Sequence, residues 1–133
     1  GALISMNAAR EIGNVNDDYY IAGDEIDYLY RLREYGDVIS VVNSYHYHPD
    51  VSKRPYTPTK IYYYTKNTLS LNRKYFDSVY LRNIMAILII IIRTTRRNGI
   101  SSIYALLFGK HKNAFYPAIY NGLKGVIKKD FNA

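Results

Sequence analysis

The pattern of apolar and polar positions divides the chain into an alternating first part and a helical remainder. Apolar residues gather in Ala2–Met6 and in Val38–Tyr47, and the β-branched run that opens the second of these segments is typical of a strand. Between them, apolar spacing predicts a short helix over Asn7–Ile12 and a longer helix over Gly23–Tyr35. The first part of the sequence therefore predicts strands at both ends with two helices between them.

The rest of the sequence predicts helices almost without interruption. After an irregular connection with two prolines over Val51–Thr59, apolar residues recur at helical spacing in four segments. These predicted helices cover Lys60–Phe76, Ser78–Arg97, Ile100–Phe108 and Ala114–Lys129. In the first of them, Tyr62–Tyr64 occupy three consecutive positions, so at least one should be in the core. The expected fold class is an α/β fragment: a strand-helix-strand piece at residues 1–58 followed by a mainly α-helical region at residues 59–133.

Charge separates the same two parts of the chain. Residues 1–50 hold nine acidic and three basic residues, a net charge of −6, whereas residues 51–133 hold fifteen basic and two acidic residues, a net charge of +13. An acidic part suits a divalent metal or a proton-accepting site, and a basic part suits phosphates or an anionic membrane surface. No nucleic-acid-binding motif is visible, so no nucleic-acid partner is expected.

The sequence contains no cysteine, which excludes a disulfide scaffold and any cysteine-based nucleophile or metal site. It also shows no secretory signal pattern, and we expect a cytoplasmic protein. Because the sequence starts at Gly1 and is apolar at once, with no turn before its first predicted strand, we expect it to be the C-terminal part of a longer chain.

Three acidic residues at the expected start of the second helix are the most informative feature. The stretch around them is Tyr19-Tyr20-Ile21-Ala22-Gly23-Asp24-Glu25-Ile26-Asp27-Tyr28-Leu29-Tyr30-Arg31, and Val41-Val42-Asn43-Ser44-Tyr45-His46-Tyr47-His48-Pro49 follows it. This order of aromatic approach, acidic pair, acid-aromatic-x-x-Arg helix, strand and histidine resembles the second half of the catalytic domain in family 2 glycosyltransferases. Two later motifs are similar to rhamnosyl- and galactofuranosyl-transferase-like members: Tyr62-Tyr63-Tyr64-Thr65-Lys66-Asn67, with Lys66 where arginine is usual, and Asn121-Gly122-Leu123-Lys124-Gly125.

The resemblance implies the C-terminal portion of an inverting, GT-A-type (Rossmann-like) enzyme. Such an enzyme moves a hexose or deoxyhexose from a nucleotide-diphosphate sugar to a glycan or lipid-linked acceptor in cell-surface polysaccharide synthesis. The second acid of the pair, Glu25, would be the catalytic base, and Asp24 would bind acceptor hydroxyls or orient Glu25. The candidate acceptor-binding residues are Asp27, Tyr19, Tyr20 and Tyr28. The alternative is that the three acids only stabilise the start of a helix. The 133-residue chain alone is expected to be inactive, because the donor-binding strands of such a domain come first.

Two histidines are the candidate metal ligands. His46 and His48 are two positions apart, so a regular strand would point both to one face, and a neutral imidazole can bind Mn²⁺ or Mg²⁺. The resemblance implies His48 as the ligand, with His46 the weaker candidate, and the Asp-x-Asp motif that usually completes this site is absent here. The alternative is an ordinary surface histidine. His111 lies between Lys110 and Lys112 and is expected to be solvated.

Ile84–Ile92 is an uninterrupted run of nine apolar residues. It is too short to cross a bilayer, which takes about twenty residues. Two alternatives follow: the helix is buried in a core or against a partner chain, or it lies on the inner face of a membrane with Arg93, Arg96 and Arg97 at the headgroups.

These features support two classes of function. The first is a glycosyltransferase with a nucleotide-sugar donor, a divalent metal and a glycan or lipid-linked acceptor. The second is a non-catalytic, basic helical module for membrane-surface or protein interaction, whose acids are structural. A homo-oligomer is compatible with either class.

Overall fold

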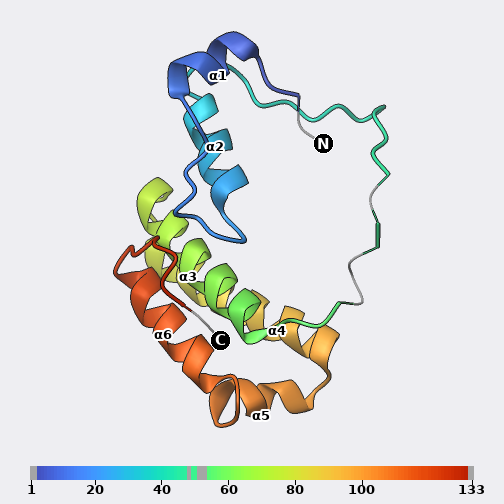
Figure 1. The fold of residues 1–133 in the computed structure, drawn as a ribbon, viewed down its shortest axis with the longest axis vertical. Helices are drawn as coiled ribbons and strands as arrows, with labels where there is room; N and C mark the ends of the chain where they lie inside the picture. Colours follow the sequence, from blue (N-terminus) through green and yellow to red (C-terminus); the bar gives the residue numbers. More distant parts are fainter. Residues whose placement is uncertain (1–2, 48, 51–53, 132–133) are drawn as a thin grey trace.

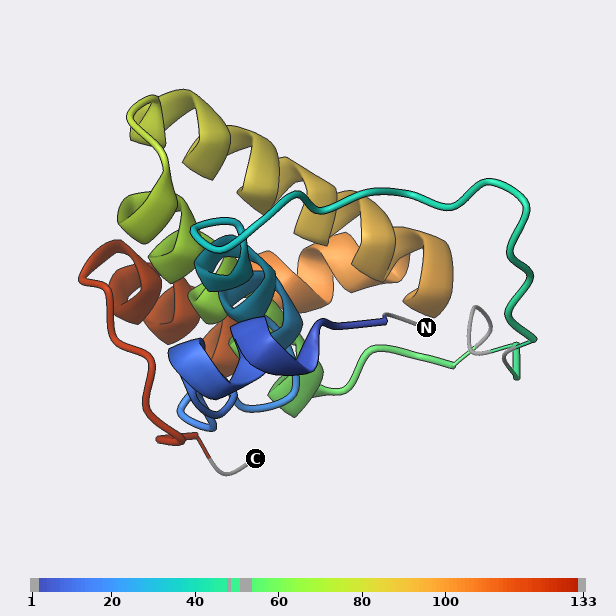
Figure 2. The ribbon, with the colours of Figure 1, turned by 90° about the horizontal axis from the view of Figure 1, so that it is seen from above.

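Six α-helices make up the structure, which is a computed structural model that describes residues 3–47, 49–50 and 54–131. The helices are α1 (Met6–Ile12), α2 (Asp24–Leu32), α3 (Pro58–Tyr75), α4 (Val79–Asn98), α5 (Ser101–Leu107) and α6 (Lys112–Leu123). Figure 1 shows α1 and α2 at one end of the molecule and the packed group α3–α6 at the other. Residues 38–47 leave the helices and run along one side (Figures 1 and 2).

Helix α3 is the centre of the packed group, with α6 on one side and α4 on another. It begins at a sequence-encoded cap: the Thr57 hydroxyl accepts a hydrogen bond from the Lys60 N–H at 3.2 Å, and Pro58 fits the first turn. Gly122 of α6 sits so close to α3 that an added Cβ would lie 2.7 Å from the Lys66 carbonyl oxygen. A glycine at this position therefore permits the close crossing of α6 and α3.

The hydrophobic core lies almost entirely among α3–α6. One cluster consists of Tyr56, Ile61, Ile90, Leu106 and Phe115, and the other of Tyr62, Tyr63, Ala114 and Ala118. Tyr62 and Tyr63 are buried, which confirms that part of the tyrosine cluster serves the core. Tyr64 is partly buried and stacks on Tyr56, with ring centroids 5.7 Å apart.

The end of the chain folds back onto α3. Helix α6 ends at Leu123, six residues before the predicted end at Lys129, and Gly125 then turns the chain with φ = 78°. The hydroxyl of Tyr62 donates a hydrogen bond to Asp130 Oδ2 at 2.9 Å. The last described residues therefore cover the start of α3 instead of extending α6.

The predicted α/β class is wrong, because the described residues form helices and contain no strand. The segment predicted as the first strand contributes its last residue, Met6, to α1, and residues 38–47 are exposed and have no regular hydrogen-bonded structure. A strand is stable only beside another strand and with one face buried. The described ranges offer neither to residues 38–47, so their β-branched composition alone does not produce a strand.

The helical predictions are confirmed apart from their ends. Helices α1 and α3–α5 begin and end within two residues of the predicted bounds. Helix α2 starts one residue after the predicted Gly23, which is its N-cap, and stops three residues before the predicted Tyr35. Apolar periodicity was therefore sufficient to predict these elements.

Candidate functional site

The acidic pair follows a constrained loop at the start of α2. Ile21 has φ = 69°, and within the described residues it is the sole non-glycine residue in the left-handed region, which is costly for a β-branched side chain. Asn67 of α3 stabilises this loop: its Nδ2 donates hydrogen bonds to the Tyr20 carbonyl at 3.1 Å and to the Ala22 carbonyl at 2.6 Å. Asn67 is buried, so α3 determines the path of the chain just before the acids.

Gly23 completes this loop. Its φ is 102°, and an added Cβ would lie 3.2 Å from side-chain atoms of Tyr19 and Leu71 and 3.3 Å from Asn67 Cβ. Both the backbone angle and the crowding favour glycine over any other residue. The Gly-Asp-Glu sequence thus places the first turn of α2 directly against α3.

The third acid of the motif, Asp27, is fully buried and ion-paired. Its Oδ1 accepts hydrogen bonds from Lys74 Nζ and the Tyr75 hydroxyl, each at 2.7 Å, and its Oδ2 accepts one from Arg31 Nε at 3.0 Å. Arg31 also donates to the carbonyls of Ile12 and Asn14 at 2.9 Å, which ties the end of α1 to α2. Asp27 therefore connects α1, α2 and α3.

The electrostatics of Asp27 agree with this structural role. Burial by itself would raise the pKa of Asp27, but the hydrogen bonds from Lys74 and Tyr75 and the positive charge of Lys74 outweigh burial, so the pKa lies below its ordinary value. The same carboxylate raises the pKa of Lys74 against the opposing effect of desolvation. Asp27 stays ionised, and its oxygens are occupied by three protein donors.

Asp24 and Glu25 differ from Asp27 in exposure. Glu25 is exposed and Asp24 is half-buried, both in the first turn of α2, where the helix dipole favours negative charge. The structure therefore separates the three acids into the buried Asp27, the half-buried Asp24 and the exposed Glu25.

The three tyrosines near the acids have different surroundings. Tyr19 is buried, and desolvation together with the negative charge of Asp27 raises its pKa to about 12. Tyr20 is 37% exposed, packs edge-to-face on Tyr63 at 5.0 Å between centroids, and has Lys129 Nζ 4.2 Å from its ring centroid. Tyr28 is partly exposed beneath Arg31. Of the three, Tyr20 and Tyr28 present ring surface to solvent.

Of the two candidate metal ligands, the structure describes only His46. His48 lies outside the described residues, so its predicted position near Asp24 and Glu25 is not described. His46 is exposed and lines an open groove of about 650 Å³ with apolar residues of the first segment, of α2 and of residues 38–47, among them Ile4, Leu32, Ile39 and Val41. Nowhere in residues 3–47, 49–50 and 54–131 do three histidine or acidic side chains come close enough to hold a metal ion.

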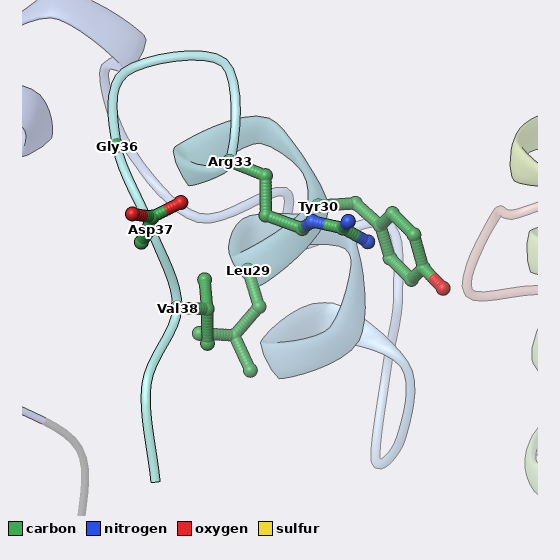
Figure 3. A pocket seen from close by; sticks show the side chains of 6 residues that line it. All are labelled: Leu29, Tyr30, Arg33, Gly36, Asp37 and Val38. Carbon is green, nitrogen blue, oxygen red and sulfur yellow. The ribbon is translucent and has the colours of Figure 1, made fainter.

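A smaller hollow of about 460 Å³ lies beside this groove at the C-terminal half of α2. Figure 3 shows Asp37 on one wall and Arg33 on the other, with Leu29 and Val38 between them. Arg33 lies 5.7 Å from the ring centroid of Tyr30. Neither hollow is lined by Asp24 or Glu25, so both are separate from the acidic pair.

Sequence reasoning missed the structural roles of two polar residues of α3. Lys66 is fully buried, with its Nζ donating to the Lys128 carbonyl and, at 2.6 Å, to Asp130 Oδ1. Its neighbour Asn67 holds the loop before α2. The sequence signal for these roles was a polar Lys-Asn pair inside a tyrosine-rich helix. Lys66 holds the segment around residues 128–130, and Asn67 holds the loop around residues 20–22.

The prediction that His111 is solvated is wrong. It is buried at the N-terminus of α6, where burial and then the positive charge of Lys110 lower its pKa.

Comparison with protein-family models, with curated proteins and with solved structures finds no match to this chain. The functional argument therefore depends on the residues and their arrangement.

Proposed function

We propose that this chain carries the acceptor-side carboxylates of an inverting glycosyltransferase, with Glu25 as general base and Asp24 as a ligand for acceptor hydroxyls. The observation that carries the proposal is the separation of the three acids within α2. Asp27 is fully buried and paired with three donors, whereas Asp24 is half-buried and Glu25 is exposed. Asn67 holds the loop before α2 and so fixes the backbone from which Asp24 and Glu25 project.

The chemistry assigned to Glu25 is a single proton transfer. The acceptor hydroxyl oxygen attacks the anomeric carbon of the donor as its proton passes to a Glu25 carboxylate oxygen, the new glycosidic bond forms, and the bond to the diphosphate breaks. Asp24 would accept hydrogen bonds from neighbouring hydroxyls and so orient the acceptor. The exposed ring of Tyr20 offers a surface for sugar C–H groups.

The divalent metal implied by the resemblance stays a prediction, because its candidate ligand His48 lies outside the described residues. No step of the proposal is therefore assigned to a metal ion. The donor is a nucleotide-diphosphate hexose or deoxyhexose, and the acceptor is a glycan or lipid-linked glycan. The cytoplasmic location expected of a cysteine-free sequence belongs to the same proposal.

Steady-state kinetics of the full-length protein test the proposal with a panel of uridine- and thymidine-diphosphate sugars. Glu25→Gln keeps size and removes the proton acceptor, so kcat should fall about 10²- to 10⁴-fold with little change in donor KM. Asp24→Asn should mainly raise the acceptor KM. Glu34→Gln is the matched control, because Glu34 is an exposed acid just after α2, and it should keep wild-type activity.

Thermal melts of each variant exclude misfolding as the cause of lost activity. A Glu25→Gln enzyme near wild type beside an inactive Asp24→Asn enzyme would assign the base to Asp24. Wild-type activity in both variants would reject the proposal in favour of the non-catalytic module, for which the acids have no chemical role.

A further inference from the structure

Helix α4 is apolar on two opposite faces. The face toward α3 and α5 buries Ala86 and Ile90. At 100° per residue, Ile84, Leu88 and Ile92 lie on the opposite side of the helix from these two residues. The exposed non-aromatic apolar side chains of α4, which we call the outer face, are Leu81, Ile84, Met85, Leu88, Ile89 and Ile92, each between 41% and 66% exposed.

Such a helix is unusual at the edge of a protein. A helix of a globular domain normally buries one stripe and presents polar residues on the other side, and a helix that is apolar all round is covered on all sides. Figure 2 shows α4 along one margin of the molecule, with α3 and α5 on its inner side. A contiguous apolar surface of six large side chains on a margin indicates a docking surface.

The charge around the outer face indicates what covers it. Residues 78–129 contain nine lysines and arginines and no acidic residue. Arg82 lies at one end of the outer face, with its guanidinium 3.8 Å from the ring centroid of Phe76, and Arg96 lies at the other end. Arg93 is seven positions after Ala86, so it lies beside the outer face and not on it, and all three arginines are exposed. A contact between two copies of this face would bring these arginines together with no acidic residue on α4–α6 to offset them.

A bilayer with anionic lipids is complementary both to the apolar outer face and to the arginines near it. Its acyl boundary accepts aliphatic side chains without a shaped pocket, and its headgroups attract arginine. The outer face from Leu81 to Ile92 is about 16 Å long at 1.5 Å per residue, which favours a helix lying in the interface plane. Among the described helices, none is long and apolar enough to cross a membrane.

We propose that α4 docks on an anionic lipid surface, with its axis parallel to the membrane, its outer face in the acyl boundary and Arg82, Arg93 and Arg96 among the headgroups. The proposal does not depend on the glycosyltransferase assignment, because it uses no residue of α2. It places α3, which braces the acidic pair, between the membrane-facing helix and α6.

Vesicle co-sedimentation of the full chain tests the proposal. Binding to phosphatidylcholine vesicles that contain phosphatidylglycerol should exceed binding to pure phosphatidylcholine vesicles and weaken as salt rises. The triple variant Ile84→Ser, Leu88→Ser, Ile92→Ser should lower the affinity at least tenfold. Arg93→Gln and Arg96→Gln should each lower it about fivefold.

The matched control is the triple variant Ile39→Ser, Val41→Ser, Val42→Ser, which removes exposed apolar side chains outside α4. It should bind as the wild type does. Equal binding by the α4 variant and the wild type would overturn the proposal. A wild-type dimer in sedimentation velocity that the α4 triple variant abolishes, without vesicle binding, would also overturn it and assign the outer face to self-association.

Discussion

Residues 3–47 and residues 54–131 are stabilised in different ways. The first region buries three residues, Tyr19, Asp27 and Leu32, whereas the second buries twenty-two. Helix α1 buries none of its side chains. The second region therefore has a hydrophobic core of its own, whereas the folded structure of the first region depends on its contacts with α3.

That attachment is largely polar. Asp27 accepts hydrogen bonds from Lys74 and Tyr75, and Asn67 donates hydrogen bonds to the loop before α2. In addition, Tyr30 stacks on Tyr75 with ring centroids 4.5 Å apart. A polar attachment fixes direction more strictly than an apolar contact of similar size, because hydrogen bonds are directional. The difference between the regions suggests that α3 positions the acidic pair, while the rest of the first region contributes little to stability.

The largest expected effect on the free energy of unfolding comes from truncating a core side chain of the second region. Leu106→Ala removes a fully buried side chain beside Ile61 and Phe115, and should lower the free energy of unfolding by about 2–5 kcal/mol. Ile39→Ala, at a position 78% exposed, should change it by less than about 0.5 kcal/mol. Urea denaturation of both variants checks the contrast, and equal losses would show that the two regions share one core.

Removing the buried carboxylate should loosen the first region selectively. Asp27→Asn leaves the donors of Lys74 and Arg31 without an ionised partner, at a cost of about 1–3 kcal/mol. Hydrogen exchange should accelerate at the amides of α2 and stay unchanged in α3–α6. Asp24→Asn, in the same turn but half-buried, is the control. Equal acceleration throughout the second region would mean that the regions unfold as one unit.

Acid should weaken the same attachment. Because the folded-state pKa of Asp27 lies below the ordinary 3.8, its stabilisation is complete above that value and is lost as pH falls through the lower folded pKa. The near-ultraviolet circular dichroism of Tyr30 and Tyr75 should therefore decrease at pH values below 3.8, before the α-helical signal of α3–α6 is lost. In Asp27→Asn this early transition should be absent, and its persistence would assign it to other carboxylates.

A smaller pH effect is expected inside the second region. Burial lowers the folded-state pKa of His111 below 6.5, so protonation favours the unfolded chain and stability falls as pH drops below 6.5. His111→Asn keeps a polar side chain at the N-cap position of α6, where the histidine side chain makes no capping hydrogen bond, and removes the titration. Thermal melts from pH 7 downward should show a shallower decline in this variant. Identical slopes for variant and wild type would exclude His111 as the cause.

Within the candidate site, the sequence showed which residue types lie close together along the chain, but not the environment of each side chain. The acidic motif, the loop glycine and the tyrosine-rich helix were all visible as local patterns. The burial of Asp27 was not, because Asp24, Glu25 and Asp27 are equally favourable in a first helical turn and differ only in what α3 presents to them. The residue pair Lys66 and Asn67 was noted for its likeness to a motif, but its partners lie more than forty positions away.

By itself, the sequence determined the helices, since apolar periodicity, the Thr57 cap and the glycines after α1 and α4 are local features that act within one or two turns. Tertiary structure decided whether residues 38–47 would be a strand, which of the three acids would be buried and which face of α4 would meet α3. Each of these outcomes requires a partner from a distant part of the chain or from outside it. Hydrogen bonding between strands, ion pairing and burial are pairwise, so a single segment cannot fix them alone.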